Sequence, residues 1–136
     1  PTLGDSLTPT AQGFDYERQI SENGLDYYNY GISSAGKRVF RDSGRHYLTD
    51  KLTDYALEFL SQSRPAQQPF FLYMCYSAPH VLLVPRADKV RHYLYKYERF
   101  GGKFNPYYGA MIESMDDGVG RLMAWLRQRG LLENTI

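Results

Sequence analysis

Apolar residues recur at three- and four-residue intervals in two stretches of the chain, a spacing typical of amphipathic helices. The first stripe follows Thr49, which we expect to cap the helix, and Asp50, whose charge suits the first turn. The second stripe lies in 107–129, and Gly130 is placed to end that helix. A shorter helix is expected over 87–97. The two stripes consist of Leu52, Tyr55, Ala56, Phe59 and Leu60, and of Met111, Met115, Val119, Leu122 and Leu126.

A different pattern occupies 70–76, where the run Phe-Phe-Leu-Tyr-Met-Cys-Tyr is apolar or aromatic throughout. Because no alternation marks one side as exposed, the run predicts a strand buried on both faces, as in a parallel sheet. Residues 134–136 are interpreted as the start of a second strand. Residues 1–47 are broken by turn-forming residues and are expected to be irregular, with one short strand at 38–40.

The order helix–strand–loop–helix–strand over 48–136 is typical of the α/β class. A strand covered on both faces needs neighbouring strands and helices on either side, and the chain supplies one full strand of that kind. We therefore interpret 1–136 as an internal segment of a single larger domain, with a loop-rich part at 1–47.

Composition narrows the possible functions. The net charge of +1 over 136 residues argues against a nucleic-acid-binding protein, which normally carries a basic face. No apolar run approaches the roughly 20 residues that a membrane helix needs. The one cysteine excludes an internal disulfide and a zinc site built from several thiolates. The 13 tyrosines favour a surface or cleft rich in amphipathic rings.

The strongest candidate for chemistry is Ser77-Ala-Pro-His80, which follows directly on the expected strand. Open α/β sheets bind ligands beyond the carboxyl ends of their strands, so a histidine at this point is placed to meet a substrate. The alternative is a histidine that only hydrogen-bonds the backbone of its own loop.

Three other features of the helices have structural interpretations. Adjacent residues on a helix point about 100° apart, so Asp116-Asp117 is interpreted as a solvated face rather than an ion site. Gly118 and Gly120 weaken a helix and are interpreted as points of close packing. The basic and aromatic run 91–99 suits either a solvated helix or a surface that stacks on an anionic glycan.

Several phrases carry a family resemblance when they are taken in order. They are Gln12-Gly-Phe-Asp15; Tyr47-Leu-Thr-Asp-Lys-Leu-Thr-Asp-Tyr-Ala-Leu-Glu-Phe-Leu60; Pro69-Phe-Phe-Leu-Tyr-Met-Cys-Tyr-Ser-Ala-Pro-His80; and Tyr108-Gly-Ala-Met-Ile-Glu-Ser-Met-Asp-Asp-Gly-Val-Gly-Arg-Leu122 with Gly130-Leu-Leu-Glu-Asn-Thr-Ile136. Together they cover most of the chain and resemble the sulfatase family of the alkaline-phosphatase-like superfamily. The resemblance implies a slice of an alkaline-phosphatase-like mixed or parallel sheet sandwiched by helices.

For function, the resemblance implies hydrolysis of a sulfate ester, with a sulfated carbohydrate as the expected substrate class. In the family, the histidine of the "APH" phrase contacts the sulfate group and the departing oxygen. This role falls on His80, which is expected to be both a catalytic and a substrate-binding residue. The family's work outside the cytoplasm implies a lysosomal, extracellular or periplasmic location.

The resemblance also implies two cofactors that this chain is not expected to supply. Sulfatases make a formylglycine from a Cys or Ser in a C/S-x-P/A-x-R motif and hold a calcium ion beside it. Cys75 does not fit that motif, because Ser77 and Pro79 stand where Pro or Ala and then Arg are required. We interpret Cys75 as a buried, inert residue, and expect the nucleophile and all metal ligands to lie outside these 136 residues. The segment alone is then expected to be inactive.

Two alternatives remain open at this stage. The first is a phosphodiesterase or phosphonate hydrolase of the same superfamily, which would use a similar anion pocket. The second is a domain that binds a glycan or another partner and has lost the nucleophile.

Overall fold

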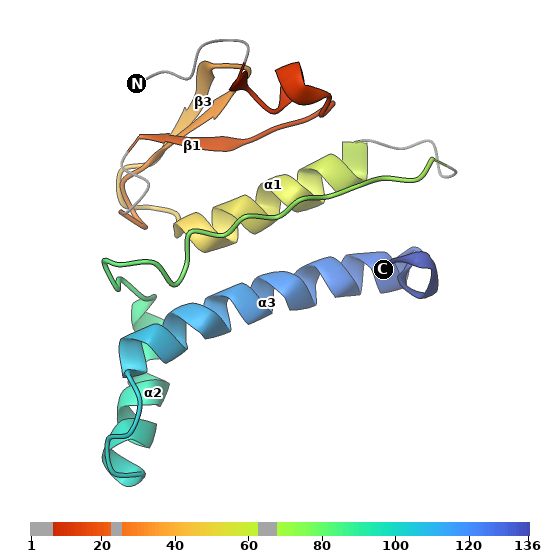
Figure 1. The fold of residues 1–136 in the computed structure, drawn as a ribbon. Coiled ribbons are helices and arrows are strands. Elements are labelled where there is room, and N and C mark those ends of the chain that lie inside the picture. The colour runs from red at the N-terminus through yellow and green to blue at the C-terminus, as the bar shows by residue number, and fades with distance from the viewer. Residues whose placement is uncertain (1–6, 23–25, 63–67) are drawn as a thin grey trace. The chain divides into compact units, whose positions relative to one another are not determined.

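The computed structural model describes residues 7–22, 26–62 and 68–136. They form two compact units that divide between Leu48 and Thr49 (Figure 1). This division falls within one residue of the boundary expected between the loop-rich part, 1–47, and the remainder. Whether both units belong to one larger domain stays a prediction. None of the described helices combines the length and the apolarity that a membrane crossing requires.

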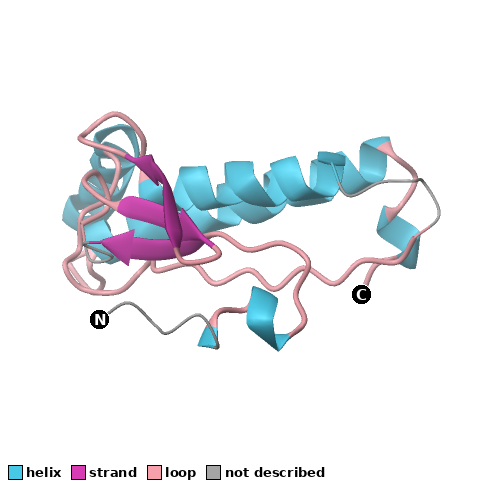
Figure 2. Cartoon of the chain, turned by 90° about the horizontal axis from the view of Figure 1, so that it is seen from above, coloured by secondary structure: helices cyan, strands magenta, loops and turns pink. Residues whose placement is uncertain are grey.

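The first unit contains a sheet where the sequence indicated mostly irregular chain. Strands β1 (Gln19–Glu22), β2 (Gly31–Ser34) and β3 (Lys37–Arg41) pair in this order, and both pairings are antiparallel (Figure 2). The short strand expected at 38–40 is therefore confirmed as β3, but the expectation of irregular chain was wrong at β1 and β2. The strands are four or five residues long, so their period is too brief to stand out among the turn residues.

A two-residue turn joins β2 to β3. Ala35 and Gly36 both have positive φ, 47° and 73°, which is the twist that a tight hairpin requires. The side chain of Glu17, which is buried, accepts hydrogen bonds from the N–H groups of Ala35 at 2.7 Å and Thr10 at 2.9 Å. One carboxylate thus fixes the hairpin turn against η2 (Thr10–Gln12).

Tyrosines form much of the buried interior near the sheet. Tyr27 and Tyr30 are almost completely buried, as is Ile32 of β2. The rings of Tyr27 and Tyr47 stack with their centroids 5.6 Å apart, and Tyr28 lies 5.2 Å from Tyr47. The tyrosine content therefore serves packing here, since a buried ring contributes a large apolar area.

Asp42 organises the chain between β3 and α1. Its buried carboxylate accepts hydrogen bonds from the N–H groups of Gly44, Arg45 and His46 at 2.8–3.1 Å, and from Nδ1 of His46 at 2.8 Å. Burial alone would raise the pKa of Asp42, but the bonds from His46, and then from Arg45 and Gly44, outweigh it and lower the pKa to about 2.

The second unit begins with the amphipathic helix α1 (Leu48–Gln62). The predicted stripe is confirmed, because Leu52, Tyr55, Ala56 and Leu60 are buried. The predicted cap is wrong. Thr49 lies inside the helix, and its buried hydroxyl has no hydrogen-bond partner among the described residues.

Residues 68–76 are extended but do not form a strand, so the prediction of a paired strand at 70–76 was wrong for the described chain. Figure 1 shows this extended segment running back alongside α1. Exposure alternates along it: Phe71, Tyr73 and Cys75 are exposed, whereas Leu72, Met74 and Tyr76 are partly buried. The two-residue period expected of a strand is therefore present. The hydrogen-bonded neighbour that would define a strand is absent from the described residues.

Helices α2 (Ala87–Arg99) and α3 (Pro106–Gln128) confirm the two helices expected there. Asn105 caps α3, and its side-chain oxygen accepts from the N–H groups of Tyr107 and Tyr108, while Pro106 opens the helix. At the other end Gly130 has φ of 67°, and the N–H of Leu131 reaches back to the carbonyl of Leu126. The predicted glycine stop is therefore confirmed as a Schellman motif.

After this stop, the predicted start of a strand at 134–136 was wrong. Residues Leu132–Asn134 form the short helix η3, and the hydroxyl of Thr135 donates to the carbonyl of Leu131. The backbone of Thr135 is extended, but its side chain is hydrogen-bonded to the turn that precedes it. Such a local bond competes with strand formation.

Close contacts explain one of the two helix glycines. A Cβ at Gly118 would lie 2.5 Å from the Tyr76 hydroxyl and 2.6 Å from that of Thr53, so α3 needs glycine there. The packing interpretation is confirmed for Gly118. It is wrong for Gly120, where a Cβ would meet nothing within 4 Å.

Gly118→Ala tests this contact, with Gly120→Ala as the matched control in the same helix. In the full-length protein we expect the Gly118 variant to lose roughly 1–3 kcal/mol of unfolding free energy, because the methyl group must displace two hydrogen-bonded hydroxyls. The Gly120 variant should gain about 0.5–1 kcal/mol through helix propensity. Denaturant unfolding of both variants measures the difference, and equal effects would contradict the close-packing assignment.

Asp42→Asn tests the carboxylate cluster. Because the folded-state pKa is about 2, the contribution of Asp42 is complete above the ordinary carboxyl value of 3.8 and is lost as pH falls from about 4 toward 2. We expect the variant of the full-length protein to be less stable by roughly 1–3 kcal/mol at pH 7, and this deficit to shrink between about pH 4 and pH 3. Denaturant midpoints across that range measure it. A deficit that is unchanged at about pH 3 would show that the charge of Asp42 is not responsible.

Candidate functional site

His80 lies on the surface, in the loop that joins the extended segment to α2. Residues 77–80 form a turn in which the N–H of His80 donates to the carbonyl of Ser77 at 2.9 Å. Ala78 is buried beneath the turn and the His80 side chain is exposed. The sequence predicted His80 on a loop that directly follows a buried strand. The loop is confirmed, but the segment before it is extended and unpaired among the described residues, with alternate side chains exposed.

The imidazole of His80 has a defined orientation. Its Nδ1 lies 2.6 Å from the carbonyl oxygen of Val81. A carbonyl oxygen can only accept, so Nδ1 must carry a proton and donate it. The ring therefore hydrogen-bonds its own loop, as one interpretation expected.

Both ends of the loop are held by α1. At its start, the hydroxyl of Tyr76 lies 2.7 Å from the hydroxyl of Thr53. Partial burial raises the pKa of Tyr76, so the group remains a neutral donor. At its end, Arg86 forms an ion pair with Asp50 in the first turn of α1.

The sequence did not reveal these partners of the loop. The sequence marks Asp50 only as an acidic residue at a helix start, and it assigns no role to Arg86. The two are 36 residues apart, and neither belongs to a phrase with a fixed spacing to the other. One local signal was present in the sequence. Arg86 and Asp88 stand two residues apart at the start of a helix, and this spacing lets the carboxylate of Asp88 hold the guanidinium of Arg86.

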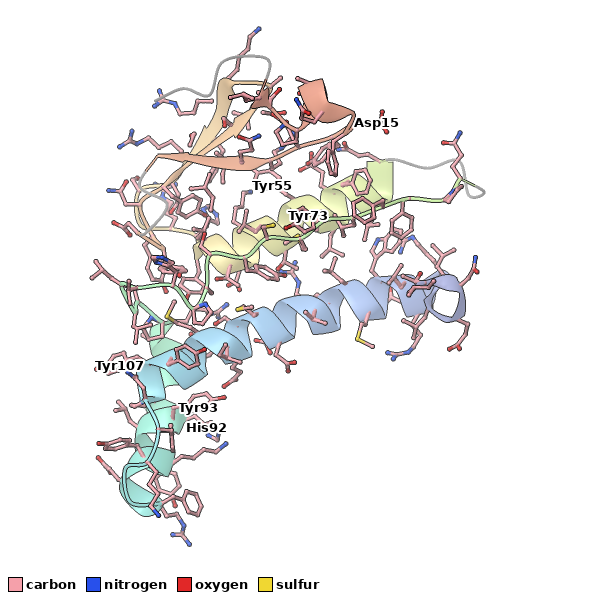
Figure 3. All side chains as sticks on the ribbon, in the orientation of Figure 1. Asp15, Tyr55, Tyr73, His92, Tyr93 and Tyr107 are labelled. Carbon is pink, nitrogen blue, oxygen red and sulfur yellow. The ribbon has the colours of Figure 1, made fainter. Side chains whose placement is uncertain are left out.

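Cys75 is exposed, which corrects the prediction of a buried thiol. An extended chain places successive side chains on opposite sides, and Cys75 falls on the same exposed side as Tyr73. A hydrogen bond between these two side chains, and then the charge of Cys75, raise the pKa of Tyr73. Figure 3 labels Tyr73 on this segment.

The described residues do not fit the two cofactors of the sulfatase family. Within 7–22, 26–62 and 68–136, no three side chains of His, Cys, Asp or Glu come together as a metal site would require. Cys75 has Ser77 and Pro79 after it, so it lacks the neighbours of a formylglycine precursor.

Helices α2 and α3 bind each other through charge and an aromatic ring. The ammonium group of Lys89 contacts Glu113 at 2.9 Å and Asp117 at 2.5 Å, and a Cβ at Gly109 would lie 2.7 Å from the ring of Tyr93. Asp117 is exposed, as expected of a solvated face. It also forms an ion pair with Lys89 of α2. Figure 3 shows Tyr93 on α2 and Tyr107 at the start of α3.

The run 91–99 lies on α2, which has no fully buried residue. Tyr93 packs on α3 and is partly buried, while Tyr95 is 60% exposed. The solvated-helix interpretation therefore describes most of this run, and the exposed rings and basic groups leave the glycan interpretation as a prediction.

Comparison with known proteins identifies the family. The Sulfatase family model matches residues 5–136. The chain is 33% identical over 128 residues to "Uncharacterized sulfatase YdeN" of Escherichia coli K12, covering 94% of this chain and 22% of that protein. It is 28% identical to a protein named "Sulfatase" from Formosa agariphila, covering 97% of this chain and 24% of that protein. It is 30% identical to mouse N-acetylgalactosamine-6-sulfatase, over 71% of this chain and 17% of that protein.

Solved structures share the fold. A crystal structure titled "Ps i-CgsB" superposes with a TM-score of 0.72 at 21% identity, covering 93% of this chain and 31% of that chain. A second, titled as the same protein in complex with k-i-k-neocarrahexaose, gives a TM-score of 0.69.

The chain belongs to the sulfatase family. The predicted α/β fold class and the sulfatase resemblance are confirmed. The chain spans about a fifth to a quarter of the length of the first curated relatives it matches.

The orientation of the His80 ring gives a prediction that is independent of activity. In the full-length protein, nitrogen-15 NMR of the neutral imidazole should show the proton on Nδ1, because that atom faces a carbonyl that only accepts. His46 is the internal reference, since its Nδ1 faces the ionised Asp42 carboxylate. A neutral His80 protonated at Nε2 would contradict the orientation.

Proposed function

We propose that the full-length protein hydrolyses sulfate esters and that His80 is one of its catalytic and substrate-binding residues. The observation that carries the proposal is the exposed imidazole whose Nδ1 is committed to the Val81 carbonyl, within a chain of the sulfatase family. An imidazole fixed in this way presents Nε2 as its exchangeable position.

The chemistry asks for a proton at one defined atom. Hydrolysis breaks the bond between sulfur and the ester oxygen, adds the elements of water, and leaves an alcohol and sulfate. The departing oxygen needs a proton when the alcohol is a poor leaving group, and protonated Nε2 of His80 can give it. The same N–H can donate a charge-assisted hydrogen bond to a sulfate oxygen before the bond breaks.

The formylglycine and the calcium ligands belong to the proposal as contributions of other residues of the full-length protein. The proposed substrate class is a sulfated carbohydrate. One relative is named for a sulfated sugar, N-acetylgalactosamine 6-sulfate, and supports this choice. Exposed Tyr95 with its basic neighbours Arg91 and Arg99 also suits such a ligand. A location in the lysosome, the periplasm or outside the cell is the corresponding proposal for the compartment.

His80→Ala in the full-length protein tests the proposal on nitrophenyl sulfate and on phenyl sulfate. We expect kcat to fall by roughly 10²–10⁴-fold on phenyl sulfate, whose leaving group needs the proton, and by much less on the activated nitrophenyl ester. The thermal midpoint should change little, because the side chain is exposed. Equal loss on both esters would contradict the proton-donor role.

His92→Ala is the matched control, since His92 is an exposed histidine on α2. Its rates should equal those of the unmodified protein. The same assays on aryl phosphate and phosphonate esters separate the alternatives. Preference for either ester would place the protein among the phosphoryl hydrolases of the superfamily. Saccharide binding without hydrolysis of any ester would make it a binding domain.

A further inference from the structure

The His80 loop is attached to one face of α1 at both ends. Thr53 contacts Tyr76, where the loop begins, and Asp50 contacts Arg86, where it ends. Asp50 and Thr53 are three residues apart on a helix, so their side chains lie on the same face. The turn bond between His80 and Ser77 is local and cannot fix the loop relative to α1. The two side-chain links can.

The link at Tyr76 joins a partly buried ring to the fully buried Thr53. The single hydroxyl proton of Thr53 goes to the carbonyl of Thr49 at 3.1 Å, so Tyr76 must be the donor in its bond to Thr53. Gly118 of α3 leaves the room for this pair. A change here disturbs three segments together and would not separate a role in positioning from one in stability.

The link at Arg86 is of a different kind. Its guanidinium binds Asp88 through two atoms, with Nε to Oδ1 at 3.0 Å and Nη2 to Oδ2 at 2.8 Å, and its remaining terminal nitrogen binds Asp50. The bonds from Asp88, and then the charge and hydrogen bond of Asp50, raise the pKa of Arg86 against the effect of partial burial. Arg86 is the residue before α2, so this guanidinium connects α1, the end of the loop and the first turn of α2.

The exposure of the pair suits a positioning role. The side chains of Arg86 and Asp50 are 35% and 30% exposed, so the ion pair is partly shielded from water and salt. Its loss would release one end of the loop while the Tyr76 link keeps the other end in place. The expected result is a displaced His80 in a folded protein.

We propose that Asp50, through its ion pair with Arg86, is a positioning residue for His80. The pair fixes the distal end of loop 77–86 to α1 and so sets where the imidazole stands. This inference rests on the proposed function, because it assigns a purpose to the position of His80.

A double-mutant cycle in the full-length protein tests it. We expect Asp50→Asn to lower kcat on phenyl sulfate by about ten-fold, because small misplacements of a catalytic group are costly. In the His80→Ala background the same change should have no effect on kcat, since no imidazole remains to be positioned. Asp50→Glu, which keeps the charge, should recover part of the lost rate. A ten-fold loss in both backgrounds would overturn the proposal in favour of a general structural role.

Asp54→Asn is the matched control. Asp54 lies on the same helix and pairs with Arg121 of α3 at 2.6 Å, with both side chains almost half exposed. This ion pair involves no residue of the His80 loop, so its removal should leave kcat within about two-fold, as surface pairs contribute little. Equal losses from Asp50→Asn and Asp54→Asn would also overturn the proposal.

Hydrogen–deuterium exchange separates this inference from the proposed function. Asp50→Asn should raise exchange of the amides in 77–86, and Asp54→Asn should not, whether or not the protein hydrolyses sulfate. If the unmodified protein fails to hydrolyse any sulfate ester, the proposed function fails while the exchange result still shows whether the pair holds the loop. Unchanged exchange in the Asp50 variant would overturn the attachment itself.

Discussion

One pair of hydroxyl groups determines how the second unit is packed. Thr53 of α1 and Tyr76 of the extended segment hydrogen-bond at 2.7 Å, and Gly118 of α3 leaves the space beside them. Thr53 is completely buried, and its hydroxyl both donates to the Thr49 carbonyl and accepts from Tyr76, so it is satisfied without water. The three segments therefore meet at one point where a polar contact, rather than apolar bulk, decides their separation. Because Tyr76 directly precedes the loop, the same contact also determines where the His80 loop starts.

The helices were predictable because their signals are local. The stripe from Leu52 to Leu60 and the Gly130 stop each depend on neighbours within one or two turns. The expected strand at 70–76 shows the limit of such signals. Its residues are extended and alternate in exposure, and these are the properties of a strand that depend on its own sequence. Pairing is a property of two segments, and no run of apolar letters specifies the partner.

The candidate site also contains one residue that the sequence indicates and a pair of residues that it does not. His80 could be found from the sequence, since a short phrase after an extended segment marks it. Asp50 and Arg86 could not be found as a pair, because an ion pair between residues 36 positions apart depends on the path of the chain between them. Cys75 was misplaced for a related reason. Burial of a strand residue depends on which side is covered, and the letters of 70–76 are apolar on both sides.

Two contacts of different range control the His80 imidazole. The orientation of the ring comes from the adjacent residue, since the Val81 carbonyl takes the proton of Nδ1 whatever the loop's location. The location comes from α1, through side chains distant in sequence. An imidazole that donates a proton needs both, because the donor atom must be Nε2 and must also lie within hydrogen-bond reach of the departing oxygen. A change that frees the loop would thus leave the tautomer intact while moving the donor away from its target, so tautomer and rate report on separate parts of the structure.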